Sequence, residues 1–357
     1  MDAYDYGLPE SAIAQRPLEP RSAARLLVGP GLGANGAAEH ATVADLPRFL
    51  RPGDVVVVND TRVLPARLAL RKRSGGSAEV LLLEPMADGK GGDIGGEVWE
   101  ALVRPGRRLP APTPLYEPDA GPDAPPVVEV GPVVGGQDDG RRSVRVLDPS
   151  VVERSGVMPL PPYIHRPLDD PERYQTVYSG SRPLGDRSTA APTAGLHFTP
   201  ELLTACLTAG ATLARVDLVV GLDTFRPVTA ATAEEHVIHT ERYAVPEETM
   251  AACAAARRVV AVGTTTVRAL ESAAATGRLE GRTDLYIHGS FPFRMVDVLV
   301  TNFHMPRSSL LLLVEAFCGP VWRRLYATAL DQGYRFLSFG DAMMVARAGT
   351  NPGRVDP

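Results

Sequence analysis

Five apolar runs in this chain are each followed directly by a group of polar side chains. The runs are Val55–Val58, Leu218–Val220, Val259–Val262, Val298–Val300 and Phe336–Leu337, and the polar groups are Asn59–Arg62, Gly221–Thr224, Gly263–Thr266, Thr301–His304 and Ser338–Asp341. Apolar runs rich in β-branched residues are typical of strands buried on both faces, as in a largely parallel sheet covered by helices. Such sheets bind ligands beyond the carboxyl ends of their strands. The sequence therefore predicts a layered α/β domain with a site among these polar groups.

A different pattern occupies residues 66–158. Short alternating segments such as Glu79–Leu83 and Val98–Val103 are separated by glycine-rich turns such as Asp88–Gly96. This pattern predicts a small antiparallel, β-barrel-like domain inserted into an α/β domain of residues 1–65 and 159–357. Eight prolines between residues 110 and 132, together with Asp and Gly, predict an exposed or disordered loop at about residues 110–140, without chemistry.

The composition is that of a globular protein, with 44% hydrophobic and 22% charged residues. A formal net charge of -5 excludes a generally basic nucleic-acid binder, but not a local basic face. Cys206, Cys253 and Cys318 lie far apart without metal-ligand spacing, which favours buried thiols in a reducing compartment. The first residues lack the basic and apolar regions of a signal peptide, and no apolar stretch approaches the ~18 residues of a membrane span. We therefore expect a cytoplasmic protein, and a monomer.

Helix signals alternate with strand signals after Pro159. One helix is predicted to start at Thr199–Pro200 and another at Pro246. Two more, Thr264–Ala275 and Ser309–Phe317, start directly after predicted strands. Their N-termini would present free N–H groups and a positive dipole end at the mouth of the sheet, where a ligand's carboxylate or phosphate is favoured.

Arg268 and Glu271 lie one turn apart within the third of these helices. That spacing is typical of an ion pair that only braces a solvated helix face, so by itself it is weak support for a binding site.

Three segments contain histidines that could take part in chemistry. His236, His239 and Glu241 could converge on a metal, but without a helical H-E-x-x-H pattern a hydrogen-bonded acid–base cluster is favoured, and we expect no metal. His304 lies at a strand end and is either structural or part of the predicted crevice. The loop Ala190–Phe198 contains His197 among small residues, which suits close approach of backbone to a ligand or, equally, tight packing.

Motifs spread over nearly the whole chain resemble S-adenosylmethionine:tRNA ribosyltransferase-isomerase, a family of queuosine biosynthesis. The motifs are Asp5–Pro9, Ile13–Pro17, Arg51–Leu68, Pro159–Ile164, Tyr174–Tyr178, Ala190–Phe198, Thr224–Val228, Gly263–Ser272, Thr301–Pro306 and Tyr334–Met343. Their order and spacing make a chance similarity implausible. Only the proline-rich segment lies clearly outside the resemblance.

The resemblance implies transfer and isomerisation of the ribosyl group of S-adenosylmethionine. The acceptor is 7-aminomethyl-7-deazaguanine in tRNA, the products are epoxyqueuosine, adenine and methionine, and S-adenosylmethionine is consumed as a substrate without a further cofactor. Such chemistry needs a base for a C5′ proton acidified by the sulfonium, an acid for the departing adenine, and shielding from water.

Candidate site residues follow from these needs. The candidates for proton transfer and its support are His197, His239, His304, Asp60, Glu241 and Asp341. The candidates for substrate binding are Arg62, Thr193, Gly195, Thr224, Gly263, Thr264, Thr265, Arg268, Glu271 and Asn302. The candidates for tRNA binding, which could instead be solvated surface of the inserted domain, are Arg67, Arg71, Lys72, Arg73, Arg104, Arg107 and Arg108.

The chain departs from the family pattern at Val219, Asp223, Arg187, Gly289 and Ser290. Most of these departures cluster around the predicted site, and Asp223 would either pair with Arg187 or meet a cationic part of the ligand. Two alternatives therefore stay open. One is S-adenosylmethionine-dependent ribosyl transfer to a small-molecule acceptor, and the other is a catalytically silent RNA-binding paralogue.

Overall fold

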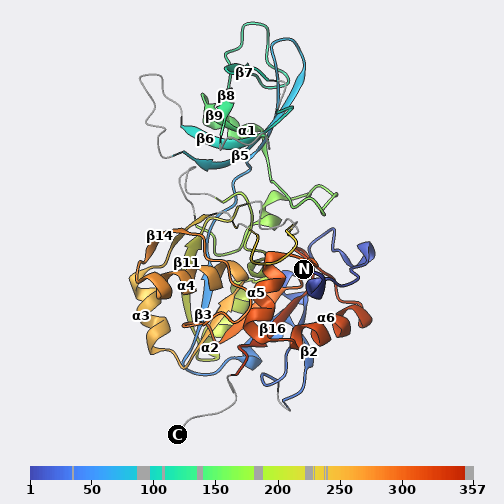
Figure 1. The fold of residues 1–357 in the computed structure, drawn as a ribbon, viewed down its shortest axis with the longest axis vertical. Helices are drawn as coiled ribbons and strands as arrows, with labels where there is room; N and C mark the ends of the chain where they lie inside the picture. The colour runs from blue at the N-terminus through green and yellow to red at the C-terminus, as the bar shows by residue number, and fades with distance from the viewer. Residues whose placement is uncertain are drawn as a thin grey trace. The chain divides into compact units, whose positions relative to one another are not determined.

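The contacts of the chain divide it into two compact units, which are described separately (Figure 1). The first comprises Met1–Arg62, Pro161–Gly180 and Ala191–Pro357, and the second comprises Val63–Leu160 and Ser181–Ala190. The predicted boundaries at residues 65/66 and 158/159 stay a prediction. The computed structural model describes residues 1–33, 36–86, 97–106, 109–134, 140–180, 188–221, 228, 230–236, 238 and 240–349.

The first unit is built on a nine-stranded sheet with the order β14-β12-β11-β3-β13-β15-β16-β1-β2. The strands are β1 (Arg25–Val28), β2 (Glu39–Thr42), β3 (Asp54–Asn59), β11 (Thr212–Leu218), β12 (Glu241–Ala244), β13 (Arg258–Val262), β14 (Glu280–Thr283), β15 (Val298–Asn302) and β16 (Ala342–Ala346). The central strands β11, β3, β13 and β15 pair in parallel, as do β16 and β1. The other neighbouring pairs are antiparallel.

The sheet is thus mixed, and the prediction of a largely parallel sheet is wrong in this respect. The runs Val55–Val58, Val259–Val262 and Val298–Val300 form the parallel strands β3, β13 and β15, as a doubly covered sheet favours. The run Leu218–Val220 instead begins only at the last residue of β11, and β16 is apolar although it is antiparallel to β15. The outer strands β2 and β14 are short and polar, so their sequences carried no strand signal. Two helices, α5 (Ser309–Cys318) and α6 (Val321–Asp331), connect β15 to β16 along the chain and pack against each other. This connection returns the chain to the edge of the sheet where β15 ends, so β16 runs antiparallel to β15.

The fifth apolar run, Phe336–Leu337, is not a strand of the sheet. Phe336 forms only an isolated bridge with Ile13, and Leu337 has a left-handed φ of 68° that no regular strand accommodates. Because β16 begins at the edge where β15 ends, the polar residues after this run still lie beside Asn302, which pairs with Ala342.

Helices cover both faces of this sheet. Alternate residues such as Val56 and Val58 belong to one buried cluster with side chains of η4 (Val43–Phe49) and α2 (Pro200–Thr208). The intervening residues Val55 and Val57 are also buried, and α3 (Glu247–Ala255), α4 (Thr264–Thr276) and α5 contact the strands without contributing to that cluster. The layered α/β arrangement and the helix starts expected at Pro200, Glu247, Thr264 and Ser309 are confirmed.

Short 3-10 helices complete the first unit. They are η1 (Asp2–Tyr4), η2 (Glu10–Ala12), η3 (Arg21–Ala23), η5 (Pro171–Tyr174) and η7 (Thr193–His197). Of these, η7 matters most for the site, because it contains Thr193 and His197.

The second unit is a seven-stranded, wholly antiparallel sheet with the order β10-β4-β5-β6-β9-β8-β7. Its elements are β4 (Arg67–Arg71), β5 (Ser77–Pro85), β6 (Val98–Arg104), β7 (Thr113–Leu115), β8 (Val128–Val133), β9 (Arg141–Val146), α1 (Ser150–Ser155) and β10 (Gly156–Val157). Arg71 of β4 and Tyr116, just after β7, exchange two backbone hydrogen bonds of 2.8 and 2.9 Å. The sheet therefore curls until β4 meets the end of β7, as the barrel-like prediction implies.

The prediction of an exposed or disordered loop holds for only part of the proline-rich segment: residues 117–126 contain no helix or strand and most of them are exposed, whereas strands lie on either side of them. These strands, β7 and β8, lie within the segment, and Leu115, Val128 and Val130 are fully buried. Pro114 is accommodated because β7 is an edge strand, where a missing N–H donor leaves no ladder bond unmade.

The three cysteines are buried and unbridged, as predicted. Burial raises the pKa of Cys206 and Cys253 to about 11 and that of Cys318 to about 12, which keeps the thiols protonated and unreactive. Among the helices that the structure describes, none combines the length and the hydropathy of a bilayer span.

Candidate functional site

The polar residues predicted to form a site meet at one edge of the nine-stranded sheet. Val58 of β3 pairs with Val262 of β13, and Val262 pairs with Val300 of β15. The residues that follow these strands therefore emerge side by side. They meet η7 there, since η7 contacts β15.

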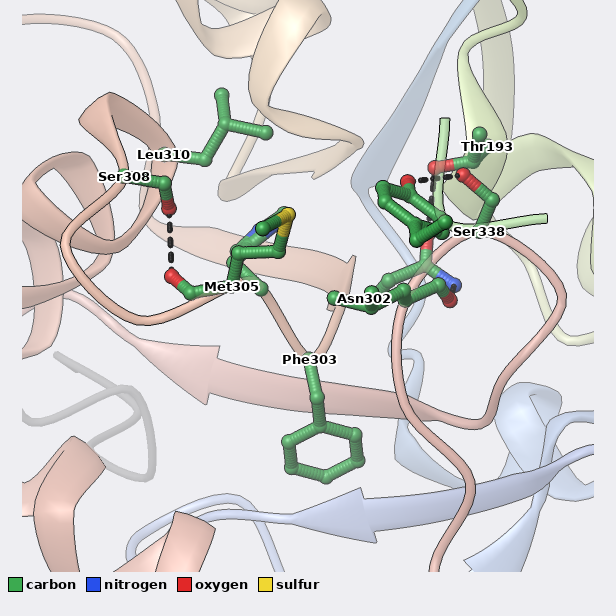
Figure 2. A pocket seen from close by; sticks show the side chains of 10 residues that line it. Thr193, Asn302, Phe303, Met305, Ser308, Leu310 and Ser338 are labelled. Atoms are coloured by element: carbon green, nitrogen blue, oxygen red, sulfur yellow. Dashed lines mark hydrogen bonds between the residues drawn. The ribbon is translucent and has the colours of Figure 1, made fainter. Parts of the chain in front are cut away.

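A two-lobed cleft opens at this edge. Thr193, Asn302, His304 and Leu310 line both lobes. The first, which we call the hydroxyl-pair lobe, has about 340 Å³ of empty space, partly open to solvent, and is completed by Tyr163, Phe303, Met305, Ser308, Leu337 and Ser338 (Figure 2). The second, which we call the helix-terminal lobe, has about 330 Å³ and is completed by Ala191, Pro192, Ala194, Val220, Gly263, Thr264, Thr265 and Thr301. These volumes include space open to solvent, and the part that admits the centre of a water molecule is about 30 Å³ in the first lobe and about 20 Å³ in the second.

Asn302 forms the wall between the lobes. Its Oδ1 accepts a hydrogen bond of 2.9 Å from the Thr193 hydroxyl, as Figure 2 shows. Its Nδ2 donates to the Leu337 carbonyl at 3.2 Å and to His197 Nε2 at 3.2 Å. An amide nitrogen can only donate, so His197 Nε2 is an acceptor and the ring is neutral.

His304 lies where the two lobes join, and its position is fixed through its backbone. Its N–H donates to the Tyr326 hydroxyl at 2.9 Å, and its carbonyl accepts from the Tyr6 hydroxyl. The ring Nε2 lies 2.9 Å from the Thr301 hydroxyl oxygen. Burial lowers the pKa of His304 to about 3, so the imidazole is neutral at physiological pH and has a lone pair available.

His197 lies behind Asn302 rather than in either lobe. Burial, followed by the positive charges of Arg335 and Arg21, lowers its pKa to about 4. The structure brings His197 into contact with a residue of the cleft but not into the cleft's wall. Its position is that of a residue that orients Asn302.

The N-terminus of α4 faces the helix-terminal lobe. Gly263, with a φ of 92°, makes the turn from β13 and donates its N–H to the Val300 carbonyl at 2.8 Å. Thr264, Thr265 and Thr266 are the first residues of the helix, and within the described chain their backbone N–H groups have no hydrogen-bond acceptor. A helix terminus of this kind attracts anionic groups.

The three threonines at this terminus differ in what their hydroxyls do. Thr265 accepts a hydrogen bond of 3.2 Å from Asn59, and Thr266 donates to the Val262 carbonyl at 2.7 Å. Thr264 is only 6% exposed and its hydroxyl has no partner among the described residues, although it lines the lobe. The Thr264 hydroxyl therefore has all of its bonding capacity left for a ligand, while the Thr265 hydroxyl, which accepts from Asn59, still has its O–H to donate.

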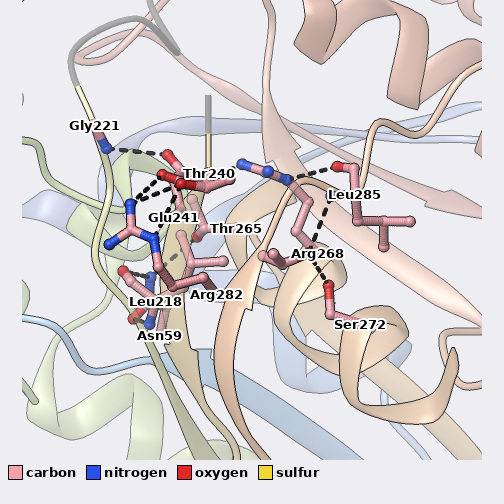
Figure 3. Close-up of polar contacts among 11 residues, drawn as sticks. Asn59, Leu218, Gly221, Thr240, Glu241, Thr265, Arg268, Ser272, Arg282 and Leu285 are labelled. Atoms are coloured by element: carbon pink, nitrogen blue, oxygen red, sulfur yellow. Dashed lines mark hydrogen bonds and ion pairs between the residues drawn. The ribbon is translucent and has the colours of Figure 1, made fainter. Parts of the chain in front are cut away.

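Glu241 and Arg268 form a buried ion pair near this terminus (Figure 3). Glu241 Oε1 also accepts from the Gly221 N–H at 3.0 Å, and Arg268 Nε donates to the Leu285 carbonyl at 3.1 Å. The pair expected between Arg268 and Glu271 is not formed.

Glu271 instead binds the segment before β15. Its carboxylate accepts from the backbone N–H groups of Arg294, Met295 and Val296 at 2.8, 3.0 and 3.1 Å. With this many donors on a buried carboxylate, Glu271 has a structural explanation that requires no substrate.

The other predicted carboxylates and Arg62 also have protein partners. Asp341 accepts from the backbone N–H groups of Arg25 and Arg335 at 2.9 and 2.8 Å and is buried. Asp60 lies 3.8 Å from Arg215. Arg62 donates to Glu172 at 2.7 Å, and none of these three lines either lobe.

Gly195 is required by packing, since a Cβ there would collide with the Tyr178 hydroxyl. This contact supports the packing interpretation of the Ala190–Phe198 loop for Gly195, whereas Thr193 of the same loop reaches the cleft.

Several predicted tRNA-binding side chains have partners within the second unit. Arg67 pairs with Glu79 at 2.8 Å. Arg71 and Arg73 donate to carbonyls of the 120–124 segment, and the Arg73 guanidinium lies 4.0 Å from the centre of the Tyr116 ring. Arg107 and Arg108 lie outside the described residues. The tRNA-binding role of this set, including Lys72 and Arg104, stays a prediction.

His239, Thr224, Asp223 and Arg187 also lie outside the described residues, so the hypothesis of an Asp223–Arg187 pair stays open. Within the described ranges, no three His, Cys, Asp or Glu side chains are grouped as a metal site would require.

Sequence reasoning missed Tyr163, Ser338, Met305 and Leu310, which line the hydroxyl-pair lobe. All except Leu310 fall within motifs or polar groups that the sequence analysis singled out. A site was expected among the polar groups, but no signal distinguished Ser338 within its group or showed that Tyr163 and Met305 line the same cleft.

The chain is similar to known proteins over almost its full length. A family profile described as "Queuosine biosynthesis protein" matches residues 1–345. Proteins named S-adenosylmethionine:tRNA ribosyltransferase-isomerase from Rubrobacter xylanophilus and Symbiobacterium thermophilum are 48% and 46% identical, over 98% and 96% of this chain and 98% of each relative. The crystal structure of S-adenosylmethionine tRNA ribosyltransferase from Thermotoga maritima matches with a TM-score of 0.51 and 35% identity, covering 96% of this chain and 99% of that one. The similarity therefore extends over the whole chain rather than over one unit.

Proposed function

This chain belongs to the queuosine biosynthesis protein family, as its motifs indicated, and we propose on that premise that it is an S-adenosylmethionine:tRNA ribosyltransferase-isomerase. It transfers and isomerises the ribosyl group of S-adenosylmethionine onto 7-aminomethyl-7-deazaguanine in tRNA. The products are epoxyqueuosine in the tRNA, adenine and methionine. The proposal includes a cytoplasmic location, because the acceptor tRNA is a cytoplasmic molecule, and retains the monomeric state expected from the sequence.

The position of His304 between the two lobes is the main observation that supports assigning the family's reaction to this cleft. A substrate with two dissimilar ends and a reactive middle suits a cleft with two lobes and a proton acceptor where they join. Among the histidines that the structure describes, only His304 lines this cleft. We therefore assign His304 as the base that removes the C5′ proton.

The low pKa of His304 is compatible with this role. In the empty cleft, protonation creates a positive charge in a buried place, which burial disfavours. In the reaction, the substrate brings its own positive sulfonium. Proton transfer from C5′ then moves a positive charge to the imidazole and leaves a neutral ylide, so the number of charges of that sign in the cleft stays constant.

Thr301 and Asn302 support the assignment. The Thr301 hydroxyl, 2.9 Å from Nε2, orients the ring. Asn302 and Thr193, which are hydrogen-bonded to each other, would present polar groups to the ribose at the same place. Both lobes are lined mainly by apolar and uncharged residues, which limits the water near a reactive intermediate.

Adenine release tests the proposal. The purified chain is incubated with S-adenosylmethionine and, in parallel, with tRNA that carries 7-aminomethyl-7-deazaguanine, with the same tRNA carrying guanine, or with the free deazaguanine base. We expect stoichiometric adenine only with the deazaguanine tRNA. Release driven by the free base would support the small-molecule transferase instead, and no release with any acceptor, despite tRNA binding, would support the silent paralogue.

A further inference from the structure

We propose that the two lobes bind opposite halves of S-adenosylmethionine, an assignment that rests on the proposed function. The methionine carboxylate binds at the N-terminus of α4 in the helix-terminal lobe. The adenine ring occupies the hydroxyl-pair lobe. The sulfonium and C5′ then lie where the lobes join, next to His304.

The helix-terminal lobe has the features of a site for a single carboxylate. Helix α4 is 13 residues long, and the backbone N–H groups of Thr264, Thr265 and Thr266 have no hydrogen-bond acceptor in the described chain. The Thr264 hydroxyl adds a further donor, since this side chain is 94% buried, lines the lobe and has no described partner.

Among the residues that the structure describes, no charged side chain lines this lobe, so no described acidic group repels an anion there and no described basic group already neutralises one. The nearby carboxylate of Glu241 is paired with Arg268. Among the described parts of the lobe, the helix terminus is therefore the main positive feature, and a carboxylate is the anionic group that S-adenosylmethionine carries.

The hydroxyl-pair lobe suits a flat aromatic ring with a few polar atoms. Met305, Leu310 and Leu337 provide apolar contacts, while Phe303 points away from the cleft toward the aromatic rings of Tyr326 and Phe336 (Figure 2). Tyr163 and Ser338 place their hydroxyl oxygens 2.8 Å apart on the wall. Hydroxyls both donate and accept, as recognition of the nitrogen atoms of a purine requires.

The backbone that carries Ser338 is strained. Leu337 has a φ of 68°, which is costly for a residue with a branched side chain. Its conformation is held by hydrogen bonds from Leu337 N–H to the Phe303 carbonyl at 3.0 Å and from Gly340 N–H to the Leu337 carbonyl at 2.9 Å. Strain that is maintained in this way is typical of binding sites, and here it fixes Ser338 opposite Tyr163.

The reverse orientation is disfavoured by the same chemistry. It would bury the carboxylate against Met305, Leu310 and Leu337, which is costly for an ionised group. Of the four hydroxyls that line this lobe, those of Thr193 and Ser308 already donate to Asn302 and to the Met305 carbonyl, which leaves the Tyr163–Ser338 pair. It would also leave the N–H groups at the start of α4 facing a purine without a negative charge.

The test compares S-adenosylmethionine with its decarboxylated analogue, which retains the sulfonium and the adenosine. Dissociation constants are measured by titration calorimetry on the full chain, for the wild type, Thr264→Val and Ser338→Ala. Removal of the carboxylate should weaken binding to the wild type by at least about tenfold, as loss of charge-assisted hydrogen bonds implies. Thr264→Val should weaken the binding of S-adenosylmethionine by about tenfold and leave the binding of the analogue unchanged. Ser338→Ala should weaken the binding of both ligands to the same extent.

Two further variants control for folding. Thr264→Ser keeps the hydroxyl and should bind S-adenosylmethionine as the wild type does. Thr212→Val changes an exposed threonine at the start of β11 and should affect neither ligand.

Equal affinities of the two ligands for the wild type, or equal weakening of both by Thr264→Val, would overturn the lobe assignment. Adenine release, measured on the same protein preparations after addition of deazaguanine tRNA, separates this failure from failure of the proposed function. If adenine is still released while either of these two results is found, only the lobe assignment is overturned. Absence of both adenine release and S-adenosylmethionine binding in the wild type removes the function and the assignment together.

Discussion

At the scale of single residues, the sequence indicated which polar side chains reach the cleft better than it indicated their roles. Thr193, Thr264, Asn302 and His304 were predicted because they follow buried strands or lie in a loop of small residues, and all four line the cleft. Glu271 was also predicted, but backbone N–H groups distant in sequence occupy its carboxylate. A sequence shows a titratable group without its partners, so this distinction required the fold.

The two buried histidines make stability depend on pH. Their pKa values, about 4 for His197 and about 3 for His304, lie below the value of 6.5 for an exposed histidine. Between pH 6.5 and about 4 the unfolded chain therefore binds protons that the folded chain excludes. The free energy of unfolding should fall as pH decreases through this window, by roughly 1.4 kcal/mol per pH unit for each histidine.

Urea unfolding of the wild type and of His197→Gln between pH 7 and pH 4.5 measures this effect. Glutamine is not protonated in either the folded or the unfolded state at these pH values. The free energy of unfolding of the variant should therefore depend less steeply on pH, by up to the contribution of one proton. Identical slopes for the two proteins would show that His197 is protonated as readily in the folded chain as in the unfolded one.

At the scale of elements, strands and helices with strong local signals were predicted well. The start of α2 was predicted from Thr199–Pro200, and the Thr199 hydroxyl accepts an N–H group of the first turn. The start of α5 was predicted from its place after a strand, and its capping residue Ser308 was not singled out. The Phe336–Leu337 run failed because two apolar residues do not define a strand, and tertiary contacts impose a turn there. Strands β7 and β8 were missed because proline dominated the local signal, although an edge strand tolerates it.

Helix α4 is tied to the segment before β15 through Glu271. Glu271→Ala would leave three N–H donors, at Arg294, Met295 and Val296, without their acceptor, so the free energy of unfolding should fall by at least about 3 kcal/mol. Hydrogen exchange at these three amides should accelerate more than exchange in β3.

Glu280→Ala, at an exposed position on β14, is the matched control and should change stability little. If Glu271→Ala were as stable as this control and instead bound S-adenosylmethionine more weakly, Glu271 would be a ligand-binding residue after all.

At the scale of the whole molecule, the sequence indicated an α/β domain and an antiparallel β domain, but not the mixed direction of the larger sheet. Strand direction depends on where connections return the chain, and the α5–α6 pair that reverses β16 has no signature in the strand itself. The same reversal brings Ser338 beside Asn302, so a feature that could not be predicted helps to build the cleft. The similarity over the full length of the chain shows its family, and the assignment of that family's chemistry to this cleft is our proposal.

The central claim is that this cleft performs the proton transfer through His304, and single-turnover adenine release by the intact chain tests it most directly. His304→Gln is compared with the wild type and with His165→Gln, an exposed control, at saturating S-adenosylmethionine and deazaguanine tRNA, with melting temperature and S-adenosylmethionine affinity measured alongside. The account predicts that His304→Gln releases adenine at least about 10²-fold more slowly, with affinity and folding retained, and that His165→Gln matches the wild type. A folded His304→Gln variant that releases adenine within a few-fold of the wild-type rate would contradict it.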